Sequence, residues 1–145
     1  MIYPDLHFVT SILIKGDHSQ EAAQLLRKVP HPLRLSLVHR LQLENALLRL
    51  LHGSDAKQAA IARDGLRIWR QYLDEQVFLI QQFDLEHAFA KAALWNAAFS
   101  MQPPRWGHLV HPAIASLVEA TFVSFIPALR KRAADEGLAL LPERL

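Results

Sequence analysis

The sequence predicts an α/β domain with three layers, rich in helix, around a mainly parallel sheet. Apolar runs of about four or five residues alternate with longer segments whose apolar residues recur at helical spacing. Glycine or proline stands at most of the junctions, as expected where elements end. Strands that alternate with helices are typical of βα units, which would place about four or five short strands in a parallel sheet.

The first half of the chain contains most of the predicted helices. Its elements are an apolar entry at Met1–Tyr3, helices over Leu6–Ile14 and up to Lys28, a strand at Leu33–Leu37, and helices ending at Gly53 and running from Ser54 to Glu75. Asp17 or Ser19 is the expected N-cap of the second helix and Ser36 of the third. That third helix is apolar around most of its circumference, which is typical of a buried helix.

The second half alternates more regularly between strand and helix. Its elements are a strand at Val77–Ile80, a helix capped by Asp84, a loop at Met101–Gly107, a helix at Leu109–Ala120, a β-rich run at Thr121–Phe125, a helix at Pro127–Glu136 and a strand-like end at Leu138–Leu141. Pro112 falls in a predicted first turn, where proline is tolerated. Trp69 and Trp95 lie in helical apolar stripes and are expected in the core or an interface.

Composition limits the possible functions without naming one. A chain of 145 residues with 51% hydrophobic residues fits a single globular domain over 1–145. The absence of cysteine excludes disulfides and thiolate metal sites, and a net charge of +2 does not indicate a nucleic-acid binder. We find no signal peptide and no apolar run long enough to span a membrane, and we expect a cytoplasmic protein.

Five stretches, in chain order, resemble the PIN-domain family of metal-dependent ribonucleases and toxin–antitoxin toxins. They are Ile2-Tyr3-Pro4-Asp5, Leu37–Leu47 with the pattern L-x-H-R-L-x-x-E-N-A-L, Arg105–Ala115, Phe122–Phe125 and Ala133–Leu138. The resemblance covers nearly the whole chain and implies a PIN-like fold. It also implies a cluster of three or four carboxylates that hold Mg²⁺ or Mn²⁺ at the carboxyl edge of the sheet.

Only one of the acids that the resemblance implies is present. The four acid positions fall on Asp5, Gln42, His108 and Ile126, so that one carboxylate, one amide, one imidazole and one alkyl group would face the metal. Hard divalent ions bind chiefly to charged oxygen ligands. We therefore expect a catalytically impaired site with no cofactor, or with Mg²⁺ or Mn²⁺ if a site has been rebuilt around Asp5.

A mixed site of Asp5, His7 and His108 would suit Zn²⁺ or Mn²⁺, although histidines beside a lost acidic site are more often hydrogen-bonded fillers. His108 and His111 share a helix face, and we favour a packing role for His111. Glu44 follows Gln42 by about 200° around a helix and should point away from the site.

Four other residues are candidates for contact with RNA or a protein partner. His39 and Arg40 begin a helix whose first turn either holds phosphate or is simply exposed. Arg105 and Trp106 suit a stacking site for single-stranded RNA, a protein interface or a loop closed by its tryptophan. The basic runs Arg130–Arg132 and Arg27-Lys28 either follow a nucleic-acid backbone or form a solvated face.

These observations give three hypotheses. The first is a PIN-like protein, forming a homodimer, that binds RNA or protein without cutting. The second is an endoribonuclease with a rebuilt metal site around Asp5. The third is a toxin relic that is still bound by an antitoxin-like peptide.

Overall fold

The computed structural model describes residues 1–98 and 105–144, with the side chain of Trp106 outside the description. Contacts divide the chain into two units, Met1–His7 with Gln82–Leu145 and Phe8–Gln81. Helix α1 (Leu6–Leu13) begins in the first unit and continues into the second. The single domain expected over 1–145 stays a prediction.

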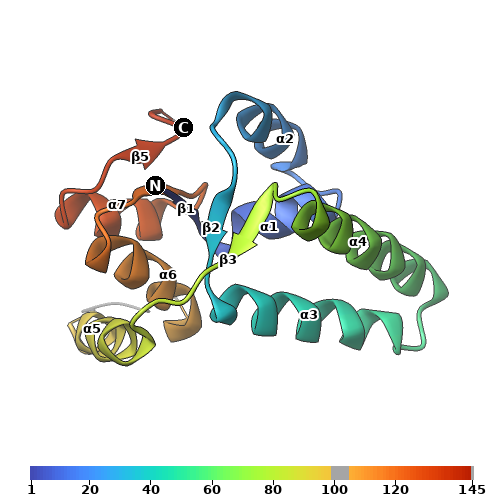
Figure 1. The fold of residues 1–145 in the computed structure, drawn as a ribbon. Helices are drawn as coiled ribbons and strands as arrows, with labels where there is room; N and C mark the ends of the chain where they lie inside the picture. The colour runs from blue at the N-terminus through green and yellow to red at the C-terminus, as the bar shows by residue number, and fades with distance from the viewer. Residues whose placement is uncertain (99–104, 145) are drawn as a thin grey trace. The chain divides into compact units, whose positions relative to one another are not determined.

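The first unit contains a three-stranded parallel sheet and three further helices (Figure 1). Its elements are β1 (Ile2–Pro4), α5 (Leu85–Ala97), α6 (Trp106–Leu117), β4 (Thr121–Val123), α7 (Pro127–Asp135) and β5 (Leu140–Leu141). The strand order is β1-β4-β5, with Tyr3 opposite Phe122 and Phe122 opposite Leu140. Tyr3 and Phe122 are fully buried, which places the apolar core of this unit on the strand pair.

The second unit contains a two-stranded parallel sheet and a pair of long helices. Its elements are α2 (Ser19–Lys28), β2 (Leu33–Leu35), α3 (Leu37–Leu51), α4 (Ala56–Asp74) and β3 (Phe78–Ile80). Helices α3 and α4 lie side by side along their length (Figure 1). Trp69 of α4 is buried and its ring packs 5.9 Å from that of Phe78, as its apolar stripe predicted.

Helix α4 contains one glycine that close packing requires. A Cβ atom on Gly65 would lie 3.3 Å from the carbonyl oxygen of Leu13 and 3.3 Å from a methyl of Leu47. Both contacts are tighter than ordinary van der Waals distance, and one of them is with backbone. Glycine here therefore lets α4 approach α1 and α3 more closely than alanine would.

The predicted fold class is confirmed, because the described residues form parallel strands that alternate with helices. None of the helices in residues 1–98 and 105–144 combines the length and the apolar character needed to span a membrane. The N-caps predicted at Ser36 and Asp84 are also confirmed.

Three predicted N-caps or helix starts are wrong. Asp55, not Ser54, caps α4, because its carboxylate accepts the backbone N–H groups of Lys57 and Gln58 at 2.9 and 3.1 Å. Neither Asp17 nor Ser19 caps α2. Instead, the hydroxyl of Ser19 accepts the N–H of Gly16 at 2.7 Å and fixes the preceding turn.

Helix α6 begins at Trp106, before the predicted start at Leu109, and so includes the end of the predicted loop Met101–Gly107. The helix starts there because the N–H of His108 donates to the carbonyl of Arg105 at 2.8 Å. Pro112 consequently lies inside the helix and not in its first turn. Residues Met101–Pro104 of the predicted loop lie outside the described residues.

The apolar circumference of α3 predicted a helix that is buried on all sides. That prediction is wrong, because one side of α3 is exposed. Leu37, Leu41 and Leu48 are 48%, 62% and 44% exposed, whereas Leu43 and Leu47 are buried. The three exposed leucines fall within about 40° of one another on the helix, on the side away from the buried pair. The apolar pattern alone therefore does not indicate which side of α3 is covered by the rest of the unit.

Candidate functional site

Asp5 lies at the carboxyl end of β1, one residue beyond the strand. Its N–H donates to the carbonyl of Val123 at 2.8 Å, which continues the parallel ladder between β1 and β4. The ladder brings Asp5 beside Ser124, the residue that follows β4. Both residues are fully buried. The position is the one expected of a ligand-binding side chain in a parallel sheet.

A short hydrogen-bonded chain defines the chemistry at Asp5. The hydroxyl of Ser124 donates to Oδ2 of Asp5 at 2.5 Å, and the N–H of Ile126 donates to the same hydroxyl oxygen at 3.0 Å. The hydroxyl is thus oriented by a backbone donor and donates its hydrogen bond to the carboxyl group of Asp5. One oxygen of the only acid that the resemblance retains is therefore occupied by protein.

Arg130 holds the backbone on which this chain depends. Arg130 as a whole residue is 8% exposed. Its guanidinium donates to the carbonyls of Ser124 at 3.0 Å, Leu141 at 3.1 Å and Pro142 at 2.7 Å. Burial lowers the pKa of the Arg130 guanidinium from its usual value. The residue thereby links the ends of β4 and β5.

The role predicted for Arg130, as part of a nucleic-acid surface or a solvated face, is therefore wrong. The sequence holds a signal for this burial, because Arg130 directly follows Leu129 and precedes Ala133 by three residues. Both of these apolar residues are buried. That spacing places Arg130 on the covered side of α7.

His108 occupies the third predicted acid position. It lies in the first turn of α6 and is half-buried. Burial, and to a lesser degree the charge of Arg105, lower the pKa of His108 below its usual value. Burial therefore favours the neutral form of the imidazole. It adds no positive charge near α6, and it cannot replace the negative charge of an aspartate.

Ile126 and Gln42 occupy the other two predicted acid positions. Ile126 is half-buried and is the N-cap residue of α7, where its N–H serves the Ser124 hydroxyl. Gln42 lies on α3 in the second unit and is half-buried. The structure therefore joins Asp5 and Ile126 through Ser124, which sequence reasoning did not single out.

The residues present do not fit a two-metal or one-metal acidic centre. Within residues 1–98 and 105–144, no group of three or more His, Asp or Glu side chains is placed to hold a metal ion. The mixed Asp5, His7 and His108 site is not formed as such a group. The donor set at the predicted acid positions contains a single carboxylate, and Mg²⁺ prefers several charged or carbonyl oxygens.

His39 is fully buried and stabilises the start of α3. Its Nδ1 atom accepts the N–H of Ser36 at 3.1 Å, in a capping-box arrangement with the Ser36 hydroxyl at 3.2 Å. An RNA or partner contact by His39 would require the imidazole to leave this arrangement. The structure gives His39 a capping role, and the contact predicted for it stays a prediction.

Arg40 is exposed and its Nε atom pairs with Glu44 Oε1 at 3.1 Å. The same Glu44 oxygen accepts the indole N–H of Trp69 at 3.1 Å. Glu44 is thus held within its own unit by two donors, in agreement with the expectation that it does not replace the missing acid. Arg105 is exposed at the start of α6, and Trp106 has no described side chain.

His111 has the packing role that we favoured. The hydroxyl of Tyr3 and Nδ1 of His111 are 3.2 Å apart, and both residues are fully buried. Tyr3 also meets the ring of Phe83 edge-on, at a centroid distance of 5.4 Å. The imidazole therefore satisfies a buried phenol, which is a polar group that the core must pair.

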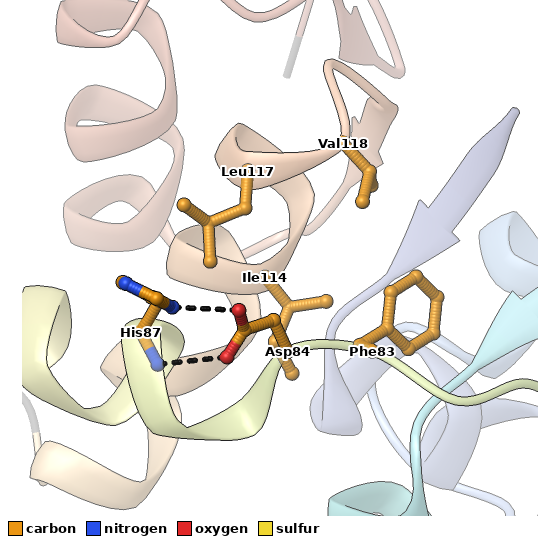
Figure 2. Close-up of a pocket in the computed structure, with 6 residues that line it drawn as sticks. All are labelled: Phe83, Asp84, His87, Ile114, Leu117 and Val118. Carbon is orange, nitrogen blue, oxygen red and sulfur yellow. Dashed lines mark hydrogen bonds and ion pairs between the residues drawn. The ribbon is translucent and has the colours of Figure 1, made fainter.

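A hollow of the first unit lies between α5 and α6, and sequence reasoning missed it. Its volume is about 260 Å³, and it is lined by Phe83, Asp84, His87, Ile114, Leu117 and Val118. Figure 2 shows the apolar side chains on one side and the Asp84–His87 pair on the other. The spacing of Ile114, Leu117 and Val118 on α6 was a usable signal, because residues three and four apart share a helix face.

Asp84 and His87 of this hollow are joined by two hydrogen bonds. Oδ1 of Asp84 accepts the N–H of His87 at 3.1 Å, and Oδ2 lies 2.6 Å from Nδ1 of the imidazole (Figure 2). The backbone N–H of His87, followed by its side chain, lowers the pKa of the Asp84 carboxyl. Both side chains are largely exposed, so the pair caps α5 at the surface.

Comparisons with known proteins agree on the fold. No protein-family model and no curated protein sequence matches the chain. The crystal structure of FitAcB from Neisseria gonorrhoeae is similar over 100% of both chains, with 11% identity and a TM-score of 0.64. FitAB bound to an IR36 DNA fragment is similar over 100% of this chain and 97% of that chain, with 13% identity and a TM-score of 0.67.

A third similar structure is VapBC2 from Rickettsia felis bound to a DNA fragment from their promoter. It is 16% identical and covers 97% of each chain, with a TM-score of 0.62. Identities this low establish the fold and not the activity. The expectation drawn from the five resembling stretches is confirmed at that level. The chain has the PIN-domain fold of the FitB and VapC toxins.

Proposed function

We propose that this protein acts by binding a protein partner of the antitoxin type, and that it does not cut RNA with a metal ion. The observation that carries the proposal is the arrangement at Asp5. Its buried carboxylate is bonded to the Ser124 hydroxyl, and the other positions that resemble family acids hold Gln42, His108 and Ile126.

Charge supports the loss of metal-dependent cutting. A site with one carboxylate lacks most of the negative charge that attracts a divalent cation. Burial lowers the pKa of His108 and favours its neutral form, and Ile126 has no donor atom in its side chain. Water activation and stabilisation of a scissile phosphate both depend on a bound ion in this chemistry.

The similar structures support a binding role. FitAB and VapBC are complexes of a PIN-domain toxin with its antitoxin, and both were solved with DNA. The shared fold supports a partner surface of the same kind in this chain. We propose an antitoxin-like peptide as the partner and a cytoplasmic homodimer as the working state. The homodimer is checked by light scattering after gel filtration.

The alternative function is a Mg²⁺- or Mn²⁺-dependent endoribonuclease with a rebuilt site. One observation favours it, because Asp5 keeps the strand-end position of a catalytic acid. RNA binding without cutting is the remaining alternative. Exposed Arg40 and Arg105 would support it, and it should show a steep loss of affinity with salt.

A cleavage assay separates these functions. The purified protein is titrated with Mn²⁺ or Mg²⁺ and then incubated with a mixed RNA pool, beside an Asp5→Asn variant. We expect no cutting by either protein. Metal-dependent cutting by the wild type that Asp5→Asn abolishes would overturn the proposal in favour of the endoribonuclease.

A gain-of-function variant sharpens the result. The triple change Gln42→Glu, His108→Asp and Ile126→Asp restores an acid at each position that the resemblance implies. Mn²⁺ binding is measured by calorimetry for the variant and the wild type. If only the variant binds Mn²⁺, the wild type lacks metal binding because of the side chains at these three positions. Equal Mn²⁺ binding by wild type and triple variant would contradict it.

A further inference from the structure

Helix α4 carries a row of three arginines on its exposed side. Arg63, Arg67 and Arg70 are spaced four and three residues apart, which places them within about 60° of one another around the helix. All three are exposed, and they extend over about 10 Å along the axis. We refer to Arg63, Arg67 and Arg70 as the arginine row.

The arginine row lines a broad groove that runs along α4 and reaches the end of α3. The groove has a volume of about 590 Å³, and it is lined by Leu51, Arg63, Leu66, Arg67, Arg70, Gln71, Asp74 and Glu75. Leu51 comes from α3, and the others come from α4 and its C-cap. The groove therefore lies entirely within the second unit.

The three guanidinium groups have no acidic partner in the part of the chain that the structure describes. The ion pairs found there are Arg40–Glu44, His87–Asp84 and Lys91–Glu136. Glu75, at the end of the groove, instead accepts the amide of Gln71 at 2.8 Å. Three like charges side by side repel one another, so a bound anion would stabilise the row.

The lining of the groove favours a peptide over a nucleic-acid backbone as the anion. Asp74 continues the row one turn beyond Arg70, and Glu75 follows it, so a phosphate chain along α4 would meet two carboxylates. Leu51 is half-buried and Leu66 is 9% exposed, so the groove also presents apolar surface, mainly from Leu51, which phosphates and riboses do not use. Arginine, in contrast, binds carboxylates with two parallel hydrogen bonds.

We propose that the groove binds an acidic amphipathic segment of a partner protein. The carboxylates of that segment pair with the arginine row, a leucine-like side chain contacts Leu51 and Leu66, and a basic residue faces Asp74 and Glu75. Acids at spacings of three and four residues on a helix match the row. The inference rests on the proposed function only in taking a protein as the occupant.

The probe is a fluorescein-labelled helical peptide of Glu and Leu, with Glu at positions i, i+4 and i+7 and one Lys a turn beyond. Its binding to the full chain is followed by fluorescence anisotropy. We expect the variant Arg63→Gln, Arg67→Gln, Arg70→Gln to bind at least about tenfold more weakly than the wild type. Thermal unfolding by circular dichroism confirms that the variant is folded.

The matched control removes three exposed charges elsewhere, as Arg27→Gln, Lys28→Gln and Lys131→Gln. It should bind the peptide within about twofold of wild type, because only general attraction is reduced. A charge-swapped variant, with Glu at all three positions of the row, should prefer a Lys and Leu peptide of the same spacing. An equal loss in the control, or no preference after the swap, would overturn the proposal.

A twelve-residue oligouridylate is the competing probe. If it binds the arginine row more tightly than the peptide does, and the Arg-to-Gln variant loses that binding, the occupant is RNA and the proposal is wrong. The cleavage assay is independent of these outcomes. RNA cutting would overturn the proposed function and leave a specific peptide result intact, whereas a failed peptide result leaves the cleavage result unaffected.

Discussion

The hydroxyl of Ser124 donates a hydrogen bond of 2.5 Å to Oδ2 of Asp5, across 119 positions of sequence. Each residue follows a strand of one parallel pair, and each is fully buried. The pair therefore connects the first strand of the chain to the residue that leads into α7.

Removing the Ser124 hydroxyl should destabilise the protein. Ser124→Ala leaves a buried carboxylate oxygen and the N–H of Ile126 without this partner, which should cost about 1–3 kcal/mol of unfolding free energy in urea titration. The control Ser116→Ala removes a half-buried hydroxyl that donates only to its own helix, and should cost less. Equal losses would show that the Asp5 contact is not special.

Arg130→Met should destabilise the chain by about 3 kcal/mol or more. The change keeps an apolar stem but removes the guanidinium that donates to the carbonyls of Ser124 and Pro142. The carbonyl of Leu141 loses one of two donors and keeps the N–H of Ser124. The next residue, Lys131, is exposed on the same helix, and Lys131→Met should stay within about 0.5 kcal/mol. Chemical unfolding of both variants checks the contrast, which a similar loss in each would contradict.

The stability of the protein should depend on pH through His108. Its pKa in the folded protein is lowered by burial, so the unfolded chain takes up a proton first as the pH falls. The stability from the neutral imidazole is fully present above about pH 6.5 and is lost as the pH falls below that value. His108→Gln lacks this dependence.

Unfolding free energies measured between pH 5 and 8 test the effect. The difference between wild type and His108→Gln should decrease toward acid pH. The other histidines are common to both proteins and cancel in that difference. Parallel pH profiles would contradict the burial of this imidazole.

The cap of α4 offers a test in which sequence and structure disagree. Asp55→Ala should cost about 1 kcal/mol, because two backbone N–H groups lose their acceptor. Ser54→Ala, at the helix start that the sequence predicted, should have little effect. Thermal melts of the two variants decide between the positions, and a larger loss at Ser54 would favour the sequence-based one.

Local chemistry made some features predictable. Ser36 and Asp84 were predicted as caps because a polar side chain directly precedes a helical pattern, and both positions agree with the structure. The order of strands and helices followed from the same patterns. Asp55 was missed because it adjoins Ser54, and both residue types are good caps.

Long-range features were not predictable from the sequence. The contact between Asp5 and Ser124 depends on which strands pair, and the burial of Arg130 depends on two backbone ends that lie 11 and 12 residues away. The exposure of Leu37, Leu41 and Leu48 depends on what covers α3, which an apolar pattern does not reveal. Periodicity identifies faces of helices, but not their neighbours.

Arg130 gives the end of the chain a mechanical connection to its beginning. The guanidinium donates hydrogen bonds to the carbonyls of Ser124, Leu141 and Pro142. The hydroxyl of the same Ser124 donates to Asp5. A displacement of β5 would therefore disturb Arg130, then Ser124, and then the carboxyl group of Asp5 that follows β1. The last strand and the carboxyl group that follows the first strand therefore share one hydrogen-bonded network.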